Sequence, residues 1–210
     1  MLDAAERAIR RVGADVSMSE IAAEAGLTKP ALYAAFPNKA SLADALAERI
    51  ALDLGRQIAQ LVREDRPVRE VTHTMVERFC ALADGDPQLY RFLVHGSMGL
   101  DRHFEDRRLV NAAAAVTTFG LRLSMERAHR DPAPAETWAY AIIGGILYAL
   151  DWWIDTRSVS LESLIDHLTD AAWALLVSAG AEQLEGPLVP PDQPSIFEDL
   201  IVRKPGEQPK

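Results

Sequence analysis

The fold is decided by residues 17–36, which read Ser17-Met18-Ser19-Glu20-Ile21-Ala22-Ala23-Glu24-Ala25-Gly26-Leu27-Thr28-Lys29-Pro30-Ala31-Leu32-Tyr33-Ala34-Ala35-Phe36. The stretch predicts two short helices joined by a turn. Ser17 or Ser19 can cap the first helix, and Gly26 can take the positive φ at which it ends. Thr28 is placed to cap the second helix, and Pro30 falls in the first turn, where a missing amide hydrogen costs nothing. The pattern is typical of a helix-turn-helix.

The second of these helices has two different faces. Leu32 and Phe36 lie four residues apart and point back at the first helix, and the small side chains of Ala22 and Ala25 allow the pair to pack tightly. The opposite side is free for the major groove of DNA. A helix-turn-helix that only packs within a helical domain is the competing interpretation.

The stretch closely resembles the DNA-binding domain of tetracycline-repressor (TetR) family transcriptional regulators. The resemblance covers about residues 2 to 50, including the apolar positions that match the family's first helix, Leu2, Ala5, Ile9 and Val12. It depends on the joint spacing of Ala25-Gly26, Leu32-Tyr33, Phe36 and Lys39. By this resemblance, Lys39 and the amide groups at the start of the next helix contact phosphate. The expected DNA-binding residues are Ser17, Ser19, Thr28, Lys29, Pro30, Ala31, Tyr33 and Lys39.

The resemblance implies an all-α homodimer with an N-terminal three-helix DNA-binding domain and a C-terminal helical ligand-binding and dimerisation domain. It implies a ligand-responsive regulator, most often a repressor, that leaves a palindromic operator when a small apolar or amphipathic effector binds. The alternative is a helical small-molecule binding or scaffold protein that no longer binds DNA. No phosphate-binding loop and no nucleophile elbow occurs in the sequence, so we expect neither an enzyme nor a cofactor.

The composition is that of an ordinary globular protein, with 210 residues, 49% hydrophobic and 25% charged. The one cysteine, Cys80, offers no disulfide framework, and Met1 runs directly into an amphipathic helix without a leader, so we expect a cytoplasmic protein. No apolar run reaches the roughly 20 residues that span a bilayer. His95, Asp101, His103 and Glu105 form a cluster whose spacing fits no zinc site, so no metal is expected.

The net charge of -9 is spread unevenly along the chain. Residues 1–50 carry six Lys or Arg against seven Asp or Glu, whereas the remainder carries 16 against 24. Residues 28–39 contain two lysines and no carboxylate, so the predicted DNA-facing surface is locally basic. The acidic excess of the chain is therefore compatible with DNA binding.

The rest of the chain divides into further helical patterns. An apolar repeat from Leu42 to Leu61 predicts one long helix that connects the two domains. Proline-containing breaks at Pro67, Pro87 and Pro132 separate the helices that follow. From Gly186 onward prolines are frequent, and we expect an extended or mobile tail. The predicted domains are 1–46 for DNA binding, 47–185 for ligand binding and dimerisation, and 186–210 for the tail.

The segment from Ala135 to Ile154 is apolar nearly all round, which is typical of a helix buried on more than one side. One side faces the core, and we expect the other to face a second copy, with Gly144-Gly145 allowing close approach. A monomeric bundle is the competing interpretation. With the amphipathic pattern after Leu161, this helix resembles the four-helix dimer interface of the family. The expected interface residues are Ile143, Ile146, Leu147, Leu164, Leu168 and Leu175.

The effector is expected to bind among aromatic and sulfur-containing side chains of the C-terminal domain, about a third of which are expected to touch it while the others pack in the core. Asp151 lies in an apolar setting and must find a partner, so it lines the ligand cavity or bonds across the subunit boundary. The two possibilities are equally favoured by the sequence. The expected ligand-binding residues are Phe79, Phe92, His95, Met98, Phe119, Tyr148, Asp151 and Trp152.

Overall fold

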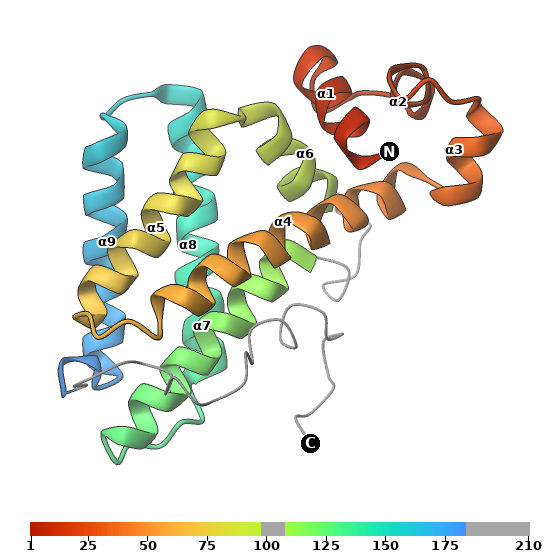
Figure 1. The fold of residues 1–210 in the computed structure, drawn as a ribbon. Coiled ribbons are helices and arrows are strands. Elements are labelled where there is room, and N and C mark those ends of the chain that lie inside the picture. The colour runs from red at the N-terminus through yellow and green to blue at the C-terminus, as the bar shows by residue number, and fades with distance from the viewer. Residues whose placement is uncertain (98–107, 184–210) are drawn as a thin grey trace.

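The computed structural model describes residues 1–97 and 108–183, and these fold into α-helices without a β-strand (Figure 1). One short 3-10 turn, Ala181–Gln183, follows the last helix. In chain order the α-helices are α1 (Leu2–Val12), α2 (Met18–Glu24), α3 (Lys29–Ala35), α4 (Lys39–Leu61), α5 (Val68–Gly85), α6 (Pro87–Ser97), α7 (Arg108–Arg127), α8 (Ala135–Thr156) and α9 (Leu161–Ser178).

Helices α1 to α3 and the first turns of α4 form the N-terminal domain. Ser17, rather than Ser19, caps α2 in a capping box with Glu20, and Thr28 caps α3 by accepting from the amide of Ala31. Gly26 has a φ of +65°, a left-handed conformation that favours glycine at the turn between the two helices. The largest fully buried side chains of this domain are Ile9, Val16, Ile21, Leu32, Leu42 and Leu46.

Helix α4 belongs to both halves of the molecule. Asn38 caps its start, and Leu42 and Leu46 complete the N-terminal core. Ile58 and Leu61, four turns further on, are buried against α5 and α7 in a second apolar cluster. The predicted boundary after residue 46 therefore falls within a continuous helix, and the predicted tail, 186–210, lies outside the described residues.

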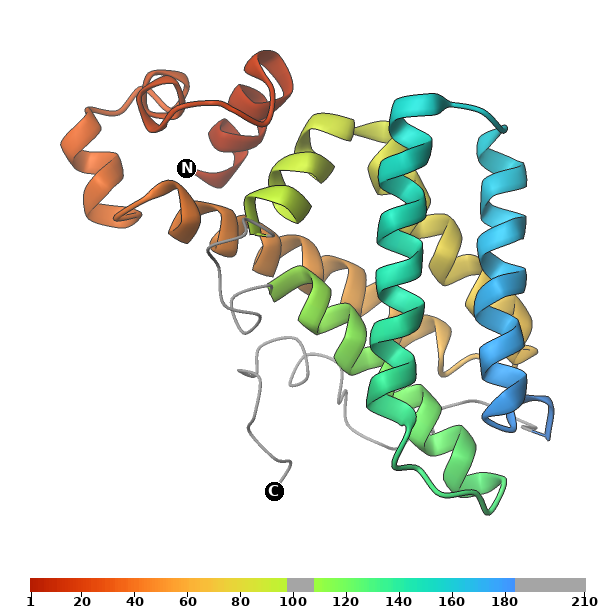
Figure 2. The same ribbon diagram turned by 180° about the vertical axis from the view of Figure 1, so that it is seen from behind.

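The C-terminal half is a bundle in which α7 packs on α8 and α5 packs on α9. Figure 2 shows α8 and α9 side by side on one outer face, with the other helices of the bundle behind them. The glycine-proline break at 85–87 separates α5 from α6, as the sequence predicts. Within the described ranges, none of these helices combines the length and apolar character that a bilayer span requires.

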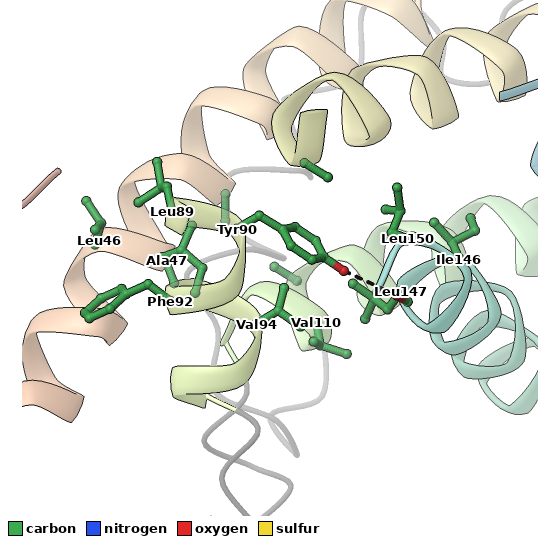
Figure 3. Packing of buried hydrophobic residues seen from close by; sticks show 14 of the residues in the cluster. Leu46, Ala47, Leu89, Tyr90, Phe92, Val94, Val110, Ile146, Leu147 and Leu150 are labelled. Carbon is green, nitrogen blue, oxygen red and sulfur yellow. Dashed lines mark hydrogen bonds between the residues drawn. The ribbon is translucent and has the colours of Figure 1, made fainter. Parts of the chain in front are cut away.

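Helix α6 lies between the two halves and packs against both α1 and α4. Its buried side chains point in opposite directions (Figure 3): Phe92 lies against Leu46 and Ala47 of α4, whereas Tyr90 reaches toward α8. The Tyr90 hydroxyl donates a hydrogen bond to the carbonyl oxygen of Leu147, 3.3 Å away. One helix thus connects the N-terminal domain with the middle of the bundle.

Candidate DNA-binding surface and ligand cavity

Helix α3 presents the surface that the sequence predicts for DNA. Its buried side is Leu32, whereas Tyr33 keeps 46% of its surface exposed. The predicted contact residues that are exposed are Ser17, Thr28, Lys29, Pro30, Ala31 and Tyr33, and Ser19 is half-buried in α2. These residues lie on α2 and α3 or at their caps, and the two helices pack against each other in the N-terminal domain (Figure 1).

Lys39 occupies a different position from the one expected. Its ammonium group donates a hydrogen bond to the carbonyl oxygen of Ala14 at 3.0 Å and lies over the Phe92 ring. The side chain is therefore directed into the joint between the α1–α2 turn and α6, rather than outward to phosphate. The sequence pattern places Lys39 at the start of α4, as observed, but does not show which neighbours its long side chain can reach.

The arginines of the N-terminal domain are all paired with carboxylates. Arg7 and Arg11 bind Glu24, Arg10 binds Asp86 and Glu6, and Arg49 binds Asp3 and Glu6. Hydrogen bonds to these arginines lower the pKa values of Asp3 and Glu24 below their ordinary range. Neither lysine of residues 1–50, all of which the structure describes, has a carboxylate partner: Lys39 donates to the carbonyl of Ala14, whereas Lys29 lies on the exposed face of α3.

The C-terminal bundle forms a partly open apolar cavity of about 150 Å³ between α4, α5, α7, α8 and α9. The described wall carries no charged side chain. Its hydroxyl groups are those of Thr72, Thr117 and Ser124, and each donates to a carbonyl of its own helix, at Val68, Ala113 and Gly120 respectively. These hydroxyl groups therefore have no proton left to donate to a ligand. The side chains that contribute most of the wall are Leu54, Ile58, Val71, Met75, Phe79, Val116, Phe119, Ile142, Ile143 and Ile146.

Some of the predicted ligand-binding residues line the cavity and others lie elsewhere. Phe79 and Phe119 line the cavity. Phe92 does not, because it is buried between α6 and α4. Tyr148 and Trp152 also lie elsewhere, on the outer side of α8, where 79% and 47% of their surfaces are exposed. Met98 and the side chain of His95 lie outside the described residues.

Of the two positions that the sequence allows for Asp151, the cavity wall is contradicted, and the subunit boundary stays a prediction. It is absent from the cavity wall and lies beside the buried hydroxyl of Tyr90. Burial raises the pKa of Tyr90 far above its ordinary value, and the nearby Asp151 carboxylate raises it further. Tyr90 therefore stays neutral and connects α6 to α8.

Four of the six predicted dimer-interface residues face the core of one protomer. Ile146, Leu147, Leu164 and Leu168 are buried inside one protomer, and Ile143 and Leu175 are half-buried against the same core. Ile143 and Ile146 line the cavity. Because α8 is apolar on nearly every side, its sequence does not show which stripe faces outward. The exposed small or apolar positions on α8 and α9 are instead Ala141, Gly144, Gly145, Tyr148 and Trp152 together with Ala171 and Ala174.

The contribution of α4 to the cavity was not predicted. A signal for it is present, because the apolar repeat of α4 continues through Leu54 and Ile58, beyond the residues that the small N-terminal domain can cover. Gly55 lies between them on the cavity wall. An apolar stripe of that length needs a second set of packing partners.

Comparison with known proteins places this architecture in a family. Residues 1–46 match the family described as "Bacterial regulatory proteins, tetR family", and residues 58–189 match "Tetracyclin repressor-like, C-terminal domain". An HTH-type transcriptional regulator of Mycobacterium tuberculosis strain H37Rv is 32% identical over 180 residues, which is 84% of this chain and 75% of the relative.

Solved structures show the same fold at lower identity. The fatty acid degradation regulator FadR of Bacillus halodurans has a TM-score of 0.64 and 18% identity, covering 81% of this chain and 95% of that one. FadR of Bacillus subtilis, solved in complex with stearoyl-CoA, has a TM-score of 0.59 and 19% identity, covering 85% and 96%. With a matching N-terminal domain, a matching C-terminal domain and a relative aligned over most of its length, the chain belongs to the TetR family of bacterial transcriptional regulators.

Proposed function

We propose that this regulator is a homodimeric repressor that binds a palindromic operator and releases it when a small apolar or amphipathic effector enters the cavity. The observation that supports this most strongly is the double role of α4. Its first turns carry Leu42 and Leu46 of the N-terminal core, and its later turns carry Leu54 and Ile58 of the cavity wall. An effector that displaces the cavity end of α4 therefore also moves the DNA-binding end.

The chemistry of the cavity wall supports an effector with a large apolar part. A pocket in which the hydroxyls already donate to carbonyls offers dispersion contacts and apolar burial, and little else. The stearoyl-CoA complex of the Bacillus subtilis structure supports the same class of ligand, because its long acyl chain is apolar. Transfer of apolar groups from water contributes about 0.8 kcal/mol for each buried methylene.

The outer face of α8 and α9 supports the dimer. Tyr148 and Trp152 are large aromatic side chains that one protomer leaves exposed. Apart from the adjacent backbone of α8 itself, no atom of the described structure lies within 4 Å of where a side chain on Gly144 or Gly145 would begin. Exposed aromatic groups beside glycines fit a surface that a second copy covers closely. In such a dimer the two α3 helices would lie about 34 to 36 Å apart, or a small multiple of that distance, when bound to successive major-groove faces.

A gel-shift experiment at stated salt concentrations tests the proposal. The probe is a palindromic fragment from the region upstream of the gene, and a scrambled fragment of equal length is the control. Specific retardation that a neutral or amphipathic alkyl compound reverses is the expected result. A helical ligand-binding protein without DNA affinity, the alternative from the sequence, would retard neither fragment.

Thermodynamic reciprocity gives this experiment a second readout. If the effector weakens operator binding by some factor, the operator must weaken effector binding by the same factor. The effector should therefore bind the DNA-free protein more tightly than the operator complex. Equal affinities in the two titrations would exclude that compound as the effector.

A further inference from the structure

Arg78 of α5 is a half-buried arginine beside the cavity. It follows Met75 by three positions and immediately precedes Phe79, and both of these neighbours line the cavity wall. Residues three apart lie on the same side of a helix, so the Arg78 side chain leaves α5 next to that wall. Arg78 itself is not one of the wall residues, and its place beside the wall follows from this helical spacing.

One nitrogen of this guanidinium has no partner. The Nη1 atom of Arg78 is buried, yet it donates no hydrogen bond in the described structure. Other arginines of the C-terminal half form ion pairs, such as Arg69 with Asp170, Arg91 with Asp155 and Arg157 with Asp84. Leaving a buried N–H of a charged group unsatisfied is costly, and native structures rarely retain such a group without a reason.

The cavity and Arg78 could bind different parts of one ligand. The wall gives an apolar body a place to bind but has no charged group for a polar head, whereas Arg78 has a positive charge and a free donor but no anion. A guanidinium binds carboxylate or phosphate oxygens through parallel N–H groups. An acidic amphiphile would satisfy both at once.

We propose that the effector is an acidic amphiphile whose apolar chain fills the cavity and whose anionic head binds Arg78. This inference rests on the proposed effector role of the same cavity. It adds the charge of the ligand and the residue that recognises it. A neutral alkyl compound would fill the cavity but leave Nη1 unsatisfied, and an alkylammonium would be repelled by it.

Isothermal titration calorimetry of the full-length protein with octanoate, octan-1-ol and octylamine tests the charge preference. The three probes share one chain length and differ in the head group. Octanoate should bind at least ~10-fold more tightly than octan-1-ol, as expected for a hydrogen bond to a charged group, and octylamine should bind most weakly. In Arg78→Met the preference for octanoate should disappear while octan-1-ol binds as before. Arg78→Lys should keep part of the preference.

Arg122→Met is the matched control. Arg122 is an exposed arginine on α7, between the cavity-lining Leu121 and Leu123, so its loss changes the net charge equally without touching the proposed head-group site. Its affinities should equal those of the unmodified protein. A free carboxylate and the phosphates of a CoA thioester are both anions, so octanoyl-CoA is titrated in parallel. The ligand that loses affinity in Arg78→Met shows whether the carboxylate or the phosphates bind this residue.

The possible failures are distinguishable. If octanoate and octan-1-ol bind equally to the unmodified protein, or if Arg78→Met weakens both alike, the head-group site is wrong while the cavity remains an effector site. If none of the probes binds, the proposed effector role of the cavity fails, and the Arg78 site fails with it.

Discussion

The Lys39 ammonium lies 5.4 Å from the centre of the Phe92 ring, and thereby joins the first turn of α4 to α6. The same group donates to the carbonyl of Ala14 in the α1–α2 turn. Gln88 of α6 accepts from the amide of Ala14, and Arg10 of α1 binds Asp86, which precedes α6. Lys39 is thus the centre of a polar joint between the DNA-binding domain and the helix that reaches the bundle.

Replacing Lys39 by Met should therefore weaken operator binding through this joint. Loss of a charged hydrogen bond and a cation–π contact should lower the free energy of unfolding by about 1 to 3 kcal/mol. The slope of log K against log salt should stay unchanged, because the ammonium group does not face phosphate. Gel shifts across a salt series, with thermal unfolding measured in parallel, check both parts. If the slope instead falls by about one, Lys39 does bind phosphate, as the family resemblance implies, and the prediction is wrong.

Tyr148→Glu should convert the proposed dimer into a monomer. The side chain is mostly exposed in one protomer, so a carboxylate there costs little in the monomer but would be buried without a partner in the interface. Multi-angle light scattering at micromolar concentration should give the monomer mass, and circular dichroism should show unchanged helix content. Ala133→Glu is the control, since Ala133 is exposed in the loop before α8 and should leave the dimer intact.

The opposite orientations of Tyr148 and Leu147 could not be predicted from the sequence of α8. The pattern of α8 predicts a helix with two buried sides, and both sides are present. Leu147 faces the core and Tyr148 the outside, yet their positions in an almost wholly apolar run give no reason to prefer either assignment. Which stripe faces outward depends on the angle at which α7 and α9 pack against α8, and that angle follows from the whole bundle.

The N-terminal domain was more predictable because its signals are local. Gly26 at positive φ, Thr28 at a cap and Leu32 in the core follow from backbone sterics and helix periodicity over a few residues. The direction of the Lys39 side chain was not predicted, because its ammonium group contacts Phe92, which is distant in sequence. The residues next to Lys39 in the sequence give no sign of such a long-range contact.

Gly120→Leu should block the cavity while preserving DNA binding. Gly120 lies in α7 on the cavity wall, and apart from the adjacent backbone of α7 no atom of the described structure lies within 4 Å of the position that a side-chain carbon would take. Replacing a helical glycine should stabilise the fold by about 0.5 to 1 kcal/mol, and the leucine would occupy the space of the effector. Operator binding should persist in the presence of effector. Gly85→Ala, at the end of α5 and away from the wall, should respond to effector normally.

Stability should decline in alkaline solution through Cys80. Burial raises the pKa of the Cys80 thiol from 9.0 to about 12, so the folded protein favours the neutral thiol. The resulting stabilisation is complete below pH 9 and is lost as the pH rises toward 12, by at most about 1.4 kcal/mol per pH unit. Urea unfolding between pH 8 and 10 measures this slope. Cys80→Ala should be less stable at pH 8 but show a flatter pH dependence, and an unchanged slope would assign the effect to other groups.

Lys29 should determine which base sequence the protein prefers. The remaining exposed residues of α3 offer few polar groups, since Ala31, Ala34 and Ala35 can make only apolar contacts such as those with thymine methyl groups. Lys29 has no carboxylate partner, so its ammonium group is free to reach a guanine. On this basis Lys29→Ala should cost roughly 1 to 3 kcal/mol on the operator and little on scrambled DNA.

Tyr33→Phe is the companion variant, because it removes one hydroxyl from the same face and should weaken binding to both DNA fragments alike. Each variant is measured on the operator and on scrambled DNA across a salt series. If Lys29→Ala costs the same on both fragments and lowers the salt slope by about one, Lys29 binds phosphate instead. Sequence preference would then depend on the shape of the DNA and on apolar contacts, because α3 presents no other cation for reading base edges.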